Sequence, residues 1–161
     1  MDSHAHGLWF VVVTIFFALI LSIFPLDAAI TWARPDYLLL ILVYWLLMLP
    51  ERVGVIICWC CGILLDILQG AVLGQNAFAL AVIAYIIQVS YQRLRMFSIG
   101  KQAAFVFLLE LFHILVDQCA QNINGVAQTH WLVFLPAFTT GLLWLFVRPT
   151  VAWLQRLFVV Y

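Results

Sequence analysis

Four polar side chains lie on one face of an otherwise apolar stretch, residues 103–121. Glu110, His113, Asp117 and Gln121 fall within about 80° of one another if the stretch forms an α-helix that turns about 100° per residue. An acidic residue at the centre of a membrane span costs about 2.5–3.5 kcal/mol on insertion. The pattern therefore predicts that these groups have a function or a partner inside the protein.

Several kinds of chemistry are compatible with this polar face. Glu110-x-x-His113 is half of a dinuclear iron motif, but no second Glu-x-x-His accompanies it, so we expect no metal centre. The face could instead line a path for protons or a solute. We favour a third interpretation, an interhelical polar contact. In it Asp66, Glu110 or Asp117 meets an arginine or a backbone donor.

Asp66 is the other isolated carboxylate in an apolar stretch. Gly62, Gly70 and Gly74 flank it at four-residue steps. Glycines remove side-chain bulk and let a neighbouring backbone approach closely. We predict close packing at all three glycines, in a membrane span that ends near Asp66 and turns back.

The composition excludes most soluble classes. The chain has 161 residues, of which 67% are hydrophobic and only 9% charged, whereas soluble domains carry about 25% charged residues. Its formal net charge is zero, so nothing indicates a nucleic-acid partner.

No nucleophile motif, phosphate-binding loop or His-Glu-x-x-His occurs, so we expect neither enzyme activity nor a cofactor. Cys58 and Cys61 form a lone C-x-x-C pair, which we expect to serve in helix packing.

The apolar stretches predict a single-domain, all-α integral membrane protein with six transmembrane helices. The expected spans are residues 8–26, 36–49, 53–68, 77–91, 103–120 and 131–147. Pro25 and Asp27 should end the first span, Pro136 should kink the last one, and Pro149 should stop it. Residues 150–161 are then expected to form an interfacial tail. The N-terminus lacks the basic residues of a signal peptide, so the first span should be retained.

The positive charges predict an orientation. With both termini in the cytoplasm, six basic residues fall on the inner side and only Arg34 on the outer side, as the positive-inside rule requires. The six are Arg52, Arg93, Arg95, Lys101, Arg148 and Arg156. Arg34 and Asp36 then lie at the outer end of the second span. We expect them to pair with each other or to anchor a partner near the periplasmic surface.

A run of motifs extends from Arg34 to about Ala81. Its members are Arg34-Pro-Asp36 with the apolar run to Trp45, Leu49-Pro50, Val53-Gly54, Gly62-Ile-Leu-Leu-Asp66, Gly70, Leu73-Gly74 and Ala77. In these motifs the chain resembles the MreD family of rod shape-determining proteins, and only Ile63 departs from the family pattern. The second half resembles the family in hydropathy alone.

The resemblance implies a protein of the bacterial inner membrane that binds MreC directly. It also implies RodA, the elongation penicillin-binding protein and MreB in the same complex, and a fold similar to the substrate-binding subunits of energy-coupling-factor transporters. We therefore expect a non-enzymatic scaffold of the cell-elongation machinery, surrounded by lipid. The alternative is a small-solute-binding subunit of a transporter. We place it second because the outward turns lack a concentration of aromatic and polar groups.

Overall fold

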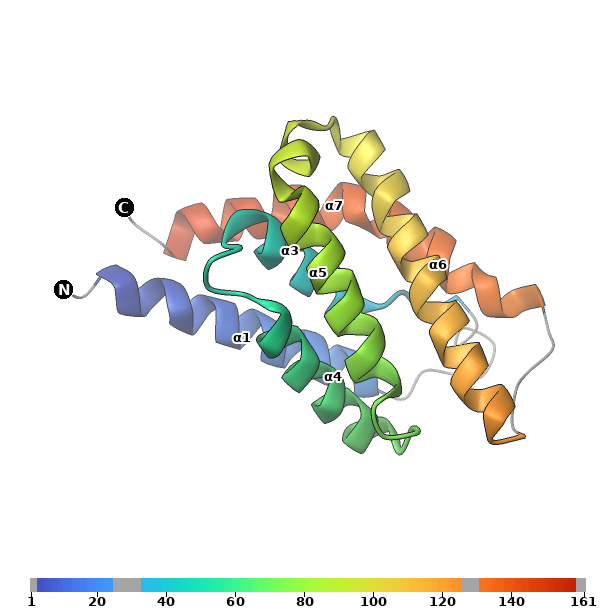
Figure 1. Cartoon of the computed structure of the whole chain (residues 1–161). Helices are drawn as coiled ribbons and strands as arrows, with labels where there is room; N and C mark the ends of the chain where they lie inside the picture. Colours follow the sequence, from blue (N-terminus) through green and yellow to red (C-terminus); the bar gives the residue numbers. More distant parts are fainter. Residues whose placement is uncertain (1–2, 25–32, 126–130, 159–161) are drawn as a thin grey trace.

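The computed structural model describes residues 3–24, 33–125 and 131–158, and these ranges are helical without any strand. The predicted all-α fold with six α-helices is confirmed (Figure 1). The helices are α1 (Ser3–Ile23), α3 (Tyr37–Met48), α4 (Val55–Gln69), α5 (Gln75–Met96), α6 (Ile99–Ile123) and α7 (Leu135–Phe158), and the 3-10 helix η1 (Trp131–Phe134) precedes α7. Pro25, Asp27 and His130, together with residues 159–161, lie outside the described ranges.

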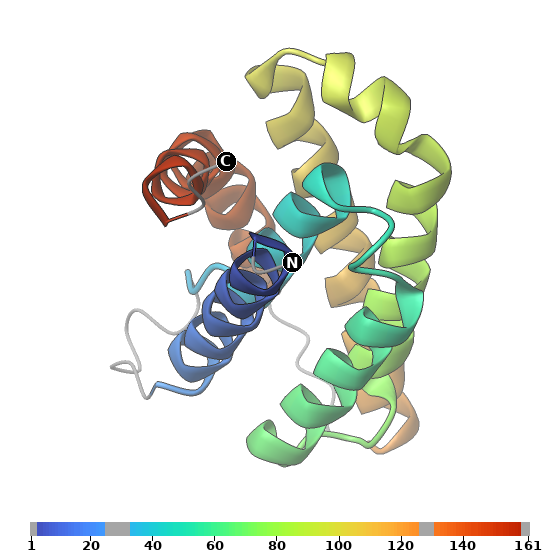
Figure 2. The ribbon, with the colours of Figure 1, turned by 90° about the vertical axis from the view of Figure 1, so that its left-hand side faces the viewer.

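Three of the helical stretches are long and apolar enough to cross a membrane. They are Gln75–Met96, Ile99–Ile123 and Trp131–Leu157, whereas the apolar parts of α1, α3 and α4 are shorter. The first turn of α1 and the last turn of α7 lie on the same side of the molecule, at the left of Figure 1 and toward the viewer in Figure 2. An even number of crossings requires this arrangement. The orientation relative to the membrane stays a prediction.

Helix α3 is the centre of the bundle. Nine of its 12 residues are buried, and it packs against α1, α5, α6 and α7. At about 1.5 Å per residue it is only about 18 Å long, well short of the ~30 Å hydrocarbon core. A helix this apolar and this short is stabilised by neighbouring helices on all sides. Large apolar side chains of the outer helices, such as Trp9, Phe16 and Trp59, are exposed instead.

Helices α4 and α5 form a closely packed hairpin. A Cβ atom added to Gly62 would lie 2.4 Å from the Cα atom of Ala77, so the two backbones touch at this point. Cys58 and Cys61 are free and buried in the same helix. Both therefore contribute to helix packing.

The predicted end of the last helix is wrong. Helix α7 continues through Pro149 to Phe158, so residues 150–158 do not form a separate tail. The missing N–H of Pro149 removes one helical hydrogen bond, but the packing of Val151 against the core stabilises the turn that follows. The kink expected at Pro136 is also absent, because Pro136 lies in the first turn of α7, where a helix tolerates proline.

Candidate functional site

Asp66 is completely buried at the end of α4 and caps the N-terminus of α5. Its carboxylate accepts hydrogen bonds from the backbone N–H groups of Gly74 at 2.9 Å and Asn76 at 3.0 Å. The N–H of Ala77 lies 3.5 Å away. The first N–H groups of a helix have no partner within the helix and attract negative charge. Asp66 therefore meets backbone donors, which is one of the two partners that the sequence predicted.

Two of the three glycines near Asp66 do not have the expected role. No atom lies within 4 Å of a Cβ placed on Gly70 or Gly74, so the prediction of close packing there is wrong. Their φ angles are +63° and +95°, in the left-handed region that favours glycine. These two residues shape the turn that brings the start of α5 back over Asp66. Only Gly62 lies in a close helix–helix contact.

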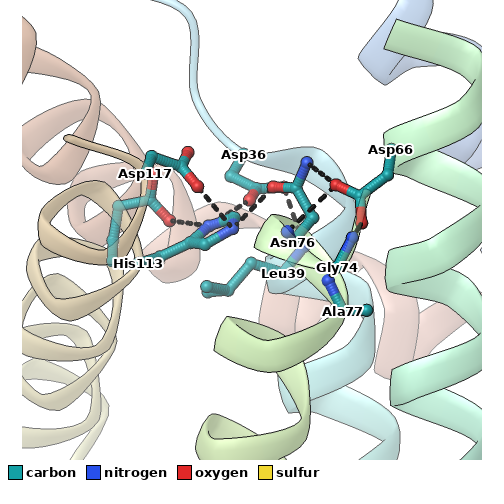
Figure 3. A network of polar contacts seen from close by, with 9 residues as sticks. Asp36, Leu39, Asp66, Gly74, Asn76, Ala77, His113 and Asp117 are labelled. Atoms are coloured by element: carbon teal, nitrogen blue, oxygen red, sulfur yellow. Dashed lines mark hydrogen bonds and ion pairs between the residues drawn. The ribbon is translucent and has the colours of Figure 1, made fainter. Parts of the chain in front are cut away.

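Asn76 connects Asp66 to His113. Its side-chain Nδ2 donates to Asp66 Oδ1 at 2.9 Å, and its Oδ1 lies 2.9 Å from His113 Nε2 (Figure 3). Both oxygens of Asp66 accept from N–H groups, so the amide of Asn76 must direct its nitrogen toward Asp66 and its oxygen toward the imidazole. His113 Nε2 therefore carries a hydrogen.

The other imidazole nitrogen faces two carboxylates. His113 Nδ1 lies 3.0 Å from Asp36 Oδ2 and 3.8 Å from Glu110 Oε2. Asp117 Oδ1 is 3.9 Å from Nε2, on the opposite side of the ring. A lone pair on Nδ1 would repel the two carboxylate oxygens. A proton or another cation must therefore lie between Nδ1 and these oxygens.

Asp36 holds this cluster to two further helices. Its Oδ1 accepts from the backbone N–H of Leu39 at 2.9 Å and so caps the N-terminus of α3. Its own N–H donates to Thr140 Oγ1 of α7, also at 2.9 Å. Together with Asp66, Asn76 and His113, these bonds form one polar chain that joins α4, α5, α6, α3 and α7. We call this set, Asp66–Asn76–His113–Asp36–Thr140, the polar chain.

The structure brings together five of the six polar residues that the sequence predicted, namely Asp36, Asp66, Glu110, His113 and Asp117. The sixth behaves differently. Arg34 donates to the backbone carbonyl of Leu21 in α1 instead of pairing with Asp36. The third interpretation of the polar face is correct for Asp66, which accepts from backbone donors at the start of α5. Glu110 and Asp117 instead lie close to His113 of their own helix, and the carboxylate that His113 meets from another helix is that of Asp36.

Sequence reasoning missed Asn76 and Thr140 as members of the site. Asn76 lies ten residues after Asp66, and this proximity in the sequence was the available signal. Thr140 is completely buried in a span of apolar residues. The Thr139-Thr140 pair in such a span could have drawn attention to it.

A cavity of about 410 Å³ lies beside the polar chain. Arg34, Asp36, Glu110, His113 and Asp117 line it, and Gln121 lies at its edge. Among the described residues, two buried side-chain oxygens lack a hydrogen-bond partner, Glu110 Oε2 and Asp117 Oδ1. The cavity is therefore rich in hydrogen-bond acceptors.

These features define an all-helical membrane protein whose helices are joined by a buried polar network. A sequence model of the family "rod shape-determining protein MreD" matches residues 3–152. The rod shape-determining protein MreD of Haemophilus influenzae is 33% identical over 141 residues, which cover 84% of this chain and 85% of that protein. The chain belongs to the MreD family. No solved structure matches it significantly, so the likeness to the substrate-binding subunits of energy-coupling-factor transporters stays a prediction.

Proposed function

We propose that this protein acts in the determination of rod cell shape as a non-enzymatic scaffold of the bacterial elongation machinery. In this role it binds MreC directly and helps to organise peptidoglycan synthesis, in a complex with RodA, the elongation penicillin-binding protein and MreB. Membership of the MreD family supports the role in cell shape. The observation that supports direct binding of a membrane partner is an apolar groove on the bundle.

The groove lies between α1 and α7, with α3 as its floor, and has a volume of about 380 Å³. Val13 and Phe17 of α1 and Phe146 of α7 form its walls, and Leu40 of α3 lies at its base. Phe17 and Phe146 are more than half exposed. Both side chains are thus available to another hydrophobic surface.

A groove of this kind suits the transmembrane helix of a single-span partner such as MreC. Association of helices within lipid depends on close van der Waals packing, which a concave surface between two helices provides. The connections between α3 and α4 and between α5 and α6 are short, residues 49–54 and 97–98. They offer little surface to a soluble partner, so lateral contacts are favoured.

Filling the groove tests this proposal. Val13→Trp places a large side chain in the groove at a position that is 54% exposed, while Val12→Trp is a matched control at 58% exposure outside it. Both variants should accumulate normally in membranes. We expect Val13→Trp to reduce the MreC that co-purifies at least about tenfold, equivalent to about 1.4 kcal/mol of binding free energy. Equal MreC recovery with both variants would contradict binding in this groove.

We also propose that the protein lies in the inner membrane with both termini in the cytoplasm. The position of the first turn of α1 and the last turn of α7 on one side of the molecule supports this (Figure 1). Single cysteines placed at Lys101 and at Asn124, in a variant without the native cysteines, should react with impermeant reagents from opposite sides. Labelling of both from the same side would exclude this orientation.

The cavity beside the polar chain favours a second candidate function, the binding of a small solute. Its volume of about 410 Å³ falls in the range of about 300–1,000 Å³ that is usual for ligand sites. A vitamin-sized ligand should then raise the melting temperature of the purified protein. The absence of a shift across a broad ligand panel would exclude this alternative.

A further inference from the structure

We propose that Asp36, Glu110 and His113 form a mononuclear site for a divalent transition-metal ion, with Zn²⁺ as the best-fitting candidate. This inference is independent of MreC binding. It concerns the identity of the positive charge, a proton or a metal ion, between His113 Nδ1 and the two facing carboxylate oxygens.

The spacing of the donor atoms suits a metal ion. One ligand atom from each residue lies within 4.8 Å of the others. His113 Nδ1 is 3.0 Å from Asp36 Oδ2 and 3.8 Å from Glu110 Oε2. Ligands bound to tetrahedral zinc at about 2.0–2.2 Å are separated by about 3.3–3.6 Å. The observed distances bracket that separation, so small rotations of the side chains would be enough to bind an ion.

The surrounding hydrogen bonds orient the donor atoms as a metal site requires. A metal-binding histidine commonly donates its second ring N–H to a carbonyl or carboxylate oxygen. His113 Nε2 does so to Asn76 Oδ1, and Asp66 holds the amide of Asn76 in place. Nδ1 is thereby left directed at the two carboxylates. The bond from the Leu39 N–H to Asp36 Oδ1 leaves Oδ2 of Asp36 available.

Glu110 distinguishes a metal ion from a simple proton. A proton on Nδ1 would complete a hydrogen bond to Asp36, but Glu110 Oε2 at 3.8 Å is too far away to share it. Glu110 is only 3% exposed, and its Oε2 lacks a hydrogen-bond partner within the described ranges. Burial of a carboxylate oxygen without a partner is costly. A metal ion would bind Asp36, His113 and Glu110 together and remove this cost.

The ligand types favour a transition metal. Imidazole nitrogen suits Zn²⁺ and its neighbours in the first transition row, whereas Mg²⁺ and Ca²⁺ prefer oxygen ligands alone. The three residues line the polar cavity, which is large enough for water molecules to complete the coordination. Asp117 also lines the cavity, but it does not belong to the set of proposed ligands, Asp36, Glu110 and His113.

The full chain in lipid nanodiscs, with its purification tag removed, allows a direct test. His4→Ala and His6→Ala are included in every sample, because two histidines near the N-terminus could bind metal themselves. After treatment with a chelator, the protein is loaded with Zn²⁺ or Co²⁺. Bound metal is counted by elemental analysis, and visible absorption of the Co²⁺ form reports its ligands.

We expect one tightly bound ion per chain, with Co²⁺ absorption typical of nitrogen and oxygen ligands. Glu110→Gln should weaken binding at least about tenfold while the polar chain, which does not include Glu110, remains intact. Glu51→Gln is the matched control, since it makes the same substitution at an exposed acid outside the cavity. Its affinity should equal that of the parent protein. Failure of the parent protein to bind either ion, or equal affinity in Glu110→Gln, would overturn the proposal.

Discussion

The two ends of helix α3 are stabilised in different ways. At its N-terminus Asp36 joins a cluster of charged and amide groups from α4, α5 and α6, and its N–H donates to the Thr140 hydroxyl of α7. Toward its C-terminus the contacts are neutral. Tyr44 donates to Gln155 Oε1 at 2.8 Å, and Trp45 donates to Thr14 Oγ1 at 2.8 Å, amid apolar packing with Phe10.

This difference indicates where the bundle is most sensitive to substitution. At the charged end, each group depends on a partner from another helix, and the loss of one leaves a buried charge or donor unpaired. Breaking such a contact is costly in a low-dielectric interior. At the neutral end, hydrogen bonds between membrane helices contribute only about 0.6 kcal/mol on average. Substitutions of similar size at the two ends should therefore have unequal effects.

The largest effect is expected from Asp66→Leu. This change removes the acceptor for the N-terminal N–H groups of α5 and for the Asn76 amide. We expect a loss of about 3 kcal/mol in the free energy of unfolding, measured by denaturant titration in detergent. Asp66→Asn, which keeps one acceptor oxygen, should lose less. Equal stability of both variants and the parent protein would show that the charged end is not the sensitive one.

A smaller effect is expected from Gly62→Ala. The added methyl group would meet the backbone of Ala77 at 2.4 Å and must separate α4 from α5. We expect a loss of about 2 kcal/mol, measured in the same titration. Gly100→Ala is the control, because nothing lies within 4 Å of a Cβ at that position. A variant of Gly62 as stable as that of Gly100 would rule out a tight contact between these helices.

The smallest effect is expected from Tyr44→Phe at the neutral end. It removes the hydroxyl that donates to Gln155 and preserves the apolar ring. We expect a loss of about 0.6 kcal/mol, seen as a small decrease in melting temperature. A loss as large as that of Asp66→Leu would remove the proposed distinction between the two ends.

Much of the fold could be predicted from the sequence because it depends on local hydropathy. The apolar stretches indicated all six helices, and the cost of burying Asp66 indicated that it must have a partner. Local patterns failed where distant residues decide the outcome. Helix α7 continues beyond Pro149 because Val151 packs against the core. No periodicity within that segment indicates that the helix continues.

The polar site was predictable in its members but not in its connections. The spacing of Glu110, His113 and Asp117 placed them on one helical face, which is a local property. The distances from His113 to Asp36 and Asn76 depend on how three helices meet. Gly70 and Gly74 were misassigned for a related reason, since glycine serves both close packing and left-handed turns and the sequence does not separate the two uses.

The enclosure of α3 has a consequence for synthesis of the protein. Thr140 and Gln155, which bond to the two ends of the α3 region, belong to α7, which is translated after α3, α4, α5 and α6. While α4, α5 and α6 are translated, α3 has not yet met α7, so the Asp36 N–H and the Tyr44 hydroxyl lack their bonds to Thr140 and Gln155. Completion of its surroundings is therefore a late, post-insertion event, and chains truncated before residue 135 should be substrates for membrane quality-control proteases.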